Sequence, residues 1–247
     1  PLDLPELNQL ISDTLHLNSA QTLPLTNLVL RKTGGNPFFV GEFLKTLHSD
    51  QLLSFNRKAR CWQWELEQIQ ARNITDNVVV LMTDKIQRLN PNTQRMLTLA
   101  AALGNRFNAA TLANVCEHSE AEIKNLLWEA LMIGLISPKD GDYRFVHDRV
   151  QQAAYLLIPQ AERPTLHWNI GQLLLTQDAS AVEEHLFKIV DHLNLGIHLA
   201  NSTQRQELAY LNLHAGRKAR EASAYQAAYS YLTIGLSLLD AHCWQQH

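Results

Sequence analysis

The sequence predicts a mainly α fold interrupted by two short β-hairpins. Apolar residues recur at intervals of three and four along most of the chain, as in Ile123, Leu127 and Ala130, which is the period of an amphipathic helix. Residues 52–64 and 135–146 break this pattern with short strand-like runs around turn residues. With 46% hydrophobic residues in 247, the chain can bury ordinary cores. We therefore expect two or three small, mostly helical domains.

Charge and cysteine content argue against several classes of function. The formal net charge is -3 and the isoelectric point is near 6.4, so no bulk attraction to nucleic acid or to an anionic membrane surface is expected. Cys61, Cys116 and Cys243 are widely spaced without a CxxC pair, which disfavours a disulfide framework and a zinc site. No apolar run reaches the roughly 20 residues that cross a bilayer. We expect a cytoplasmic segment, part of a longer protein because the chain starts at Pro1 without methionine.

Residues 1–50 contain a joint between two helices. In the run Gly34-Gly35-Asn36-Pro37, glycine can end one helix with a positive φ, asparagine can cap the next helix, and proline fits its first turn. A tight interhelical joint is the simpler interpretation of these residues. The alternative is a nucleotide contact, in which the proline ring stacks on an adenine and the exposed backbone offers polar groups.

Residues 51–75 are expected to form a hairpin linker with strands near 52–55 and 61–64. Trp62 and Trp64 lie on the second strand, and Phe55 lies opposite them. Aromatic residues in this arrangement favour packing across the hairpin over an aromatic cage for a ligand.

Residues 76–158 are predicted to form a winged-helix domain, because three helical segments come before the second hairpin. Asn90, followed by proline, and a capping box of Ser119 with Glu122 mark helix starts. The helical segments lie near 92–103, 109–116 and 119–134.

The third of these helices would lie along DNA if the domain read a DNA sequence. It carries Glu120, Glu122 and Glu129 against Lys124 alone. Phosphates repel a helix with this negative balance, so a nucleic-acid partner is disfavoured.

Residues 159–247 are expected to start an antiparallel, tetratricopeptide-like array of helices. Small residues such as Ala215, Ala228 and Gly235 alternate with leucine and tyrosine near the end of the chain. This alternation lets neighbouring helices of a repeat protein pack closely.

Histidines at two places in the chain could carry chemistry. His185, His192 and His198 fall on one predicted helix, where their spacing without a carboxylate one turn away favours structural roles over a metal site. His147 and Asp148 open the helix after the second hairpin. A helix-starting acid beside a hydrogen-bonded ring is the simpler interpretation of that pair, and a hydrogen bond from His147 to a nucleotide phosphate is the alternative.

Four stretches of the sequence carry a family resemblance: 33–47, 74–79 (ITDNVV), 99–107 (LAAALGNRF) and 145–157 (FVHDRVQQAAYLL). Taken in order, they resemble the region that follows the nucleotide-binding domain in STAND signalling ATPases. The chain looks most like this region of large bacterial, especially cyanobacterial, sensor proteins with a serine/threonine kinase domain at one end and a histidine kinase at the other. The resemblance covers nearly the whole chain.

The resemblance implies a role and a ligand for particular residues. It implies that residues 1–50 are the helical lid of a nucleotide-binding module, with Gly35 and Pro37 as the G-x-P element near the adenine. It implies that His147 senses the β-phosphate of ADP and that Asp148 orients the wing. The implied cofactor is ATP or ADP, with magnesium supplied by an upstream core.

The sequence lacks the motifs of ATPase and kinase catalytic domains. The sequence has no G-x-x-x-x-G-K-[ST] loop, no kinase glycine loop and no H-R-D or D-F-G set. It also departs from the leucine-rich lid element common in the family, since Asn36 and Phe38 flank Pro37. We therefore expect a segment that is not itself an enzyme, within an ATPase and protein kinase parent.

The expected function is to latch a nucleotide state and relay it. The expected partners are the upstream nucleotide-binding core and the downstream output domains of the same chain, together with proteins bound by the helical array. Activation could also produce an oligomer. The alternatives are a helical protein-interaction scaffold without nucleotide dependence and, third, a DNA-binding transcription regulator.

Overall fold

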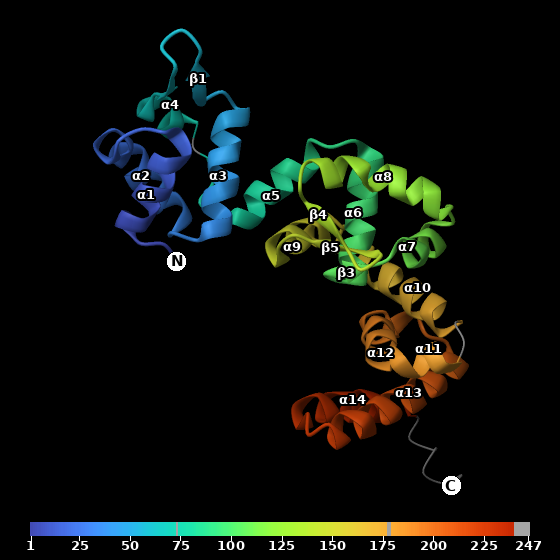
Figure 1. Ribbon diagram of the computed structural model, residues 1–247. Helices are drawn as coiled ribbons and strands as arrows, with labels where there is room; N and C mark the ends of the chain where they lie inside the picture. The colour runs from blue at the N-terminus through green and yellow to red at the C-terminus, as the bar shows by residue number, and fades with distance from the viewer. Residues whose placement is uncertain (73, 177–178, 240–247) are drawn as a thin grey trace. The chain divides into compact units, whose positions relative to one another are not determined.

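The computed structural model describes residues 1–72, 74–176 and 179–239, and it confirms the mainly helical fold class (Figure 1). The secondary structure is 69% helical, and the described residues contain fourteen α-helices and two small antiparallel sheets. The chain divides into two compact units. The first consists of Pro1–Gln94 with Phe145–Ala154, and the second of Arg95–Arg144 with Tyr155–His247.

Three helices form the core of the first unit. Two of them begin at capping boxes, formed by Asp3 with Glu6 and by Asn18 with Gln21, in which each side chain satisfies a backbone N–H of the other residue. The helices are α1 (Leu4–Leu15), α2 (Ser19–Thr33) and α3 (Pro37–Ser49). Their buried apolar side chains include Leu7, Ile11, Leu25, Val29, Phe43 and Leu47.

A hairpin and two further helices follow α3. Phe55 pairs with Trp62 across the hairpin, and the two rings meet edge to face with their centroids 5.6 Å apart. The packing predicted for these two aromatic residues is therefore confirmed. The elements are β1 (Leu53–Asn56), β2 (Cys61–Trp64), α4 (Leu66–Ala71) and α5 (Val78–Gln87).

Glu42 links α3 to α5 by a buried ion pair. Its carboxylate accepts hydrogen bonds from Lys45 and Lys85, each at 2.7 Å. Burial by itself raises the pKa of Glu42, but the hydrogen bonds and charges of the two lysines outweigh burial and hold the pKa below its ordinary value. Asp50 and Arg88, which follow the two helices, form a second ion pair at 3.2 Å. These contacts hold α5 against α3.

Three helices and a three-stranded sheet come next along the chain. The predicted second hairpin is present, and a short strand pairs with it, so the strand order is β3-β5-β4. The predicted capping box of Ser119 with Glu122 starts α8. The elements are α6 (Pro91–Leu103), β3 (Arg106–Phe107), α7 (Ala109–Cys116), α8 (Glu120–Met132), β4 (Ile136–Lys139) and β5 (Asp142–Phe145).

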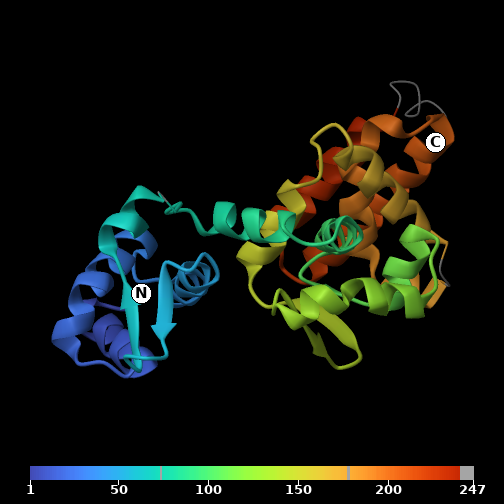
Figure 2. The same ribbon diagram turned by 90° about the horizontal axis from the view of Figure 1, so that it is seen from above.

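The remaining elements are helical, and α13 and α14 lie side by side in Figures 1 and 2. Glycines allow their close approach. A Cβ on Gly216 would meet the Leu232 side chain at 2.7 Å, and one on Gly235 would meet Asn212 at 3.2 Å. The elements are α9 (Asp148–Leu156), α10 (Arg163–Leu175), α11 (Ala179–Glu184), α12 (Leu186–Leu195), η1 (Ile197–Leu199), α13 (Ser202–Glu221) and α14 (Tyr225–Ser237).

A buried histidine pair joins α10 to α12 in the second unit. The Nδ1 atoms of His167 and His192 are 2.8 Å apart, and the Tyr155 hydroxyl lies 2.9 Å from Nε2 of His167. Burial, and then the charges of His167 and Lys188, lower the pKa of His192 from 6.5 to about 4. Burial also lowers the pKa of His167. Both rings are therefore neutral at neutral pH, and a single proton lies between them.

The prediction that His185, His192 and His198 share one helix is wrong. His185 precedes α12, and His198 lies in η1 after α12 has ended at Leu195. Gly196 marks the break, since it packs so closely against α10 that a Cβ would meet that helix at 2.7 Å.

We expect the second unit to lose stability as the pH falls from about 6.5 towards 4, because the unfolded chain binds a proton on His192 before the folded chain does. The loss is on the order of 3 kcal/mol. His192→Gln should remove most of this pH dependence, and His198→Gln, at an exposed position, should leave it in place. Urea unfolding at several pH values measures both variants, and an unaltered profile for His192→Gln would contradict this assignment.

Candidate functional site

The turn between α2 and α3 holds two of the residues predicted to contact a nucleotide. Gly34 ends α2 with a φ of 59°, and Gly35 follows with a φ of 71°, both in the left-handed region that favours glycine. Asn36 caps α3, and Pro37 is its first residue. The tight interhelical joint predicted for this run is therefore present.

Gly35 is buried beneath the start of the chain. Its carbonyl accepts a hydrogen bond from the Leu2 N–H at 2.7 Å, and its own N–H donates to Oγ1 of Thr33 at 3.3 Å. A Cβ on Gly35 would overlap the carbonyl oxygen of Leu2. The polar groups of Gly35 are thus used within the chain, whereas Pro37 is exposed.

His147, the third predicted contact, caps the start of α9. Its Nδ1 accepts a hydrogen bond from the Arg149 N–H at 3.1 Å, and its carbonyl accepts one from the Val150 N–H at 2.9 Å. A neutral imidazole that accepts at Nδ1 carries its proton on Nε2. The half-buried ring therefore presents an N–H donor on the side away from the helix backbone.

Phe38 connects these two places. Its ring stacks on the His147 imidazole with the centroids 4.2 Å apart and an angle of 9° between the ring planes. Both residues belong to the first unit. The structure thus brings His147 against the residue that follows Pro37, although the two lie far apart in the sequence. Sequence reasoning did not assign Phe38 to the site, and its only signal was an aromatic residue directly after Pro37.

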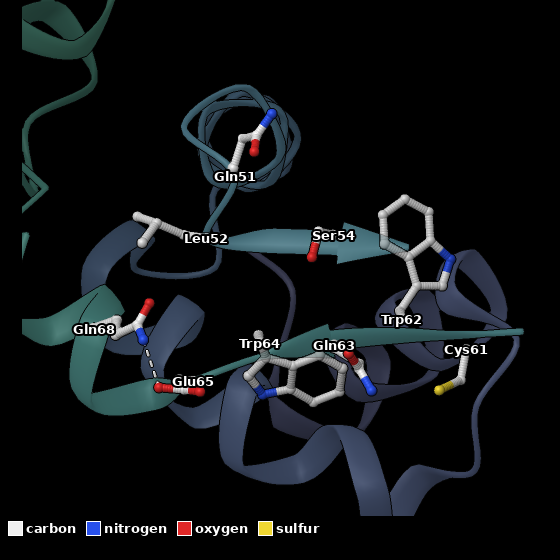
Figure 3. Close-up of a pocket in the computed structure, with 9 residues that line it drawn as sticks. All are labelled: Gln51, Leu52, Ser54, Cys61, Trp62, Gln63, Trp64, Glu65 and Gln68. Carbon is white, nitrogen blue, oxygen red and sulfur yellow. Dashed lines mark hydrogen bonds between the residues drawn. The ribbon is translucent and has the colours of Figure 1, made fainter. Parts of the chain in front are cut away.

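An open pocket of about 620 Å³ lies beside the β1–β2 hairpin (Figure 3). Glu65 at its edge accepts a hydrogen bond from Gln68 at 2.5 Å, so this carboxylate already has a partner. The lining supplies mainly amide and indole groups and shows no pairing of an acid with a base for catalysis. It consists of Gln51, Leu52, Ser54, Cys61, Trp62, Gln63, Trp64, Glu65 and Gln68.

The described residues offer neither a metal-binding cluster nor a membrane-spanning helix. No group of three or more His, Cys, Asp or Glu residues in this part of the chain is placed to hold a metal ion. Within the same residues, none of the helices combines the length and apolar content needed to cross a bilayer.

Comparison with known proteins connects the chain to signalling kinases. It is 31% identical over 310 aligned positions to the hybrid signal transduction histidine kinase G of Dictyostelium discoideum, covering 100% of this chain and 9% of that protein. It is 24% identical over 237 positions to the peroxide stress-activated histidine kinase mak3 of Schizosaccharomyces pombe, covering 92% of this chain and 10% of that protein. The chain is similar to one segment of signal-transduction histidine kinases.

The matched segment is a small part of each relative, at about one tenth of its length. No family model matches the chain. The comparisons therefore support a relationship to histidine kinases and leave the roles of Gly35, Pro37 and His147 as predictions.

Substitutions at the two glycines should separate backbone strain from crowding. Gly34→Ala should cost about 1 kcal/mol, because only the left-handed φ is unfavourable and the space around it is open. Gly35→Ala should cost more, because the added Cβ also displaces Leu2. Urea unfolding, with hydrogen exchange of the Leu2 amide, measures the difference. Equal losses in the two variants would show that the Leu2 contact is unimportant.

Proposed function

We propose that this segment reports the nucleotide state of a larger signalling protein of the histidine-kinase type. The observation that carries the proposal is the stack of Phe38 on His147, which joins the turn at Pro37 to the start of α9. Two positions proposed to contact one nucleotide must lie near each other, and this contact meets that requirement. The similarity to signal-transduction histidine kinases supports the kind of parent.

The geometry of His147 suits a phosphate oxygen. Nδ1 is engaged by the Arg149 N–H, which leaves Nε2–H as the donor. The exposed ring of Pro37 can pack against an adenine. The phosphate-binding loop and the magnesium ion belong to an upstream core in this proposal, because the sequence contains no such loop.

The nucleotide would act by favouring one of two arrangements of the protein. With ADP bound, Pro37 and His147 would hold the lid and the wing together, and exchange for ATP would release them. A hydrogen bond to a charged group contributes about 1.5–3 kcal/mol. Such a difference changes the ratio of two conformations roughly 10- to 150-fold. The helical array after α9 would then relay the change to output domains of the parent kinase.

A protein-interaction scaffold is the second candidate function, and the surface of α8 favours it. In the proposed winged helix, α8 holds the position of the recognition helix. It exposes two large apolar residues, Trp128 and Met132, whose exposed fractions are 63% and 67%. The Nζ atom of Lys124 forms an ion pair with Oε2 of Glu120 on the same helix, at 3.7 Å. Exposed tryptophan and methionine suit a protein surface better than a phosphate backbone, which also counts against DNA binding.

In the full-length protein, His147→Ala should weaken ADP binding roughly 10-fold and raise the basal signalling output, because the latch loses its hydrogen-bond donor. Calorimetric titration with ADP and an assay of kinase output measure the two effects. His118→Ala, at an exposed position between α7 and α8, is the control and should change neither. If His147→Ala also changes neither, the latch is excluded and the scaffold becomes the better account.

A further inference from the structure

We propose that Phe38 is a positioning residue that holds the His147 ring in its donor orientation and couples α3 to α9. The inference deepens the proposed function, and only its consequence for ADP binding rests on that function. The positioning of His147 can be measured without any nucleotide.

The contact is built between two helix starts. Phe38 is the second residue of α3, whose start is fixed by the Asn36 side chain accepting from the Phe39 N–H at 3.0 Å. His147 precedes the first residue of α9, and the Arg149 N–H holds its Nδ1. The rings therefore have little freedom to move unless a helix moves with them.

Both helices carry buried side chains close to the stack. On α3, Phe39 and Phe43 are 4% and 0% exposed and meet edge to face. On α9, Val150 and Ala153 are completely buried. The half-buried Phe38 lies between these elements, so its ring transmits the position of one helix start to the other.

The stack holds the plane of the ring, and the cap decides which nitrogen faces outward. A tilt of the imidazole out of this plane would break the parallel contact with Phe38 and would draw Nδ1 away from the Arg149 N–H. Each interaction therefore opposes a tilt that would weaken the other. Without Phe38, the Nδ1 cap alone holds the ring, and we expect the outward Nε2–H to be presented for a smaller fraction of the time.

The stack also specifies an aromatic residue at position 38. Leucine is apolar but smaller and has no flat face, so Phe38→Leu keeps apolar contact and removes the parallel stacking. Phe38→Tyr keeps the flat ring, and the half-buried position leaves a route for its hydroxyl to reach solvent. An aromatic requirement distinguishes positioning of the imidazole from simple filling of space.

The first measurement is nitrogen-15 NMR of the histidine rings at alkaline pH in the wild-type chain and in the variants. Wild type and Phe38→Tyr should show His147 with its proton on Nε2, and its ring protons should be shifted by the aromatic neighbour. Phe38→Leu should lose that ring-current shift and show a mixture of tautomers. Phe39→Leu, a buried substitution in the same turn without the stack, controls for general loosening of α3 and should leave the His147 signals unchanged.

The second measurement is ADP affinity in the full-length protein. Phe38→Leu should weaken binding roughly three- to tenfold, and Phe38→Tyr should restore it. If Phe38→Leu gives a mixture of His147 tautomers but leaves ADP affinity unchanged, Phe38 positions the ring and the proposed nucleotide function is wrong. If His147 keeps its proton on Nε2 in Phe38→Leu as in wild type, the positioning role is overturned.

Discussion

The face-to-face contact of Phe38 with His147, with ring centroids 4.2 Å apart, joins the start of α3 to the start of α9. This contact is what brings the two parts of the candidate site together. The turn at Gly34 and Gly35 determines where α3 begins, and the hydrogen bond to Nδ1 of His147 caps α9. Because both rings lie at helix starts, the contact connects two rigid elements. A movement of either helix must alter the environment of the other ring.

Local interactions made much of this architecture predictable from sequence. Helix ends depend on caps formed by residues that are close in the sequence. The pair Ser119 and Glu122 therefore indicated the start of α8, and the run at Gly34 indicated the end of α2. The aromatic pairing of Phe55 with Trp62 was predictable for the same reason, since a short hairpin places them opposite each other. The sequence also identified the turn at Pro37 and the helix start at His147 as the positions of interest.

Contacts between distant residues were not predictable. No local pattern pairs Phe38 with His147. None indicates that Leu2 covers Gly35 and donates a hydrogen bond to its carbonyl. The hydrogen bond between His167 and His192 has the same non-local origin. Strand β3 is only two residues long, too short to show alternation, and it forms because β5 offers an edge for pairing.

Hydrogen–deuterium exchange of the full-length protein, with ADP and with a non-hydrolysable ATP analogue, tests the central claim most directly. If the contact of Phe38 with His147 reports nucleotide state, the first turns of α3 and α9 should both exchange more slowly with ADP than with the ATP analogue. Equal exchange at both places in the two nucleotide states would contradict the account.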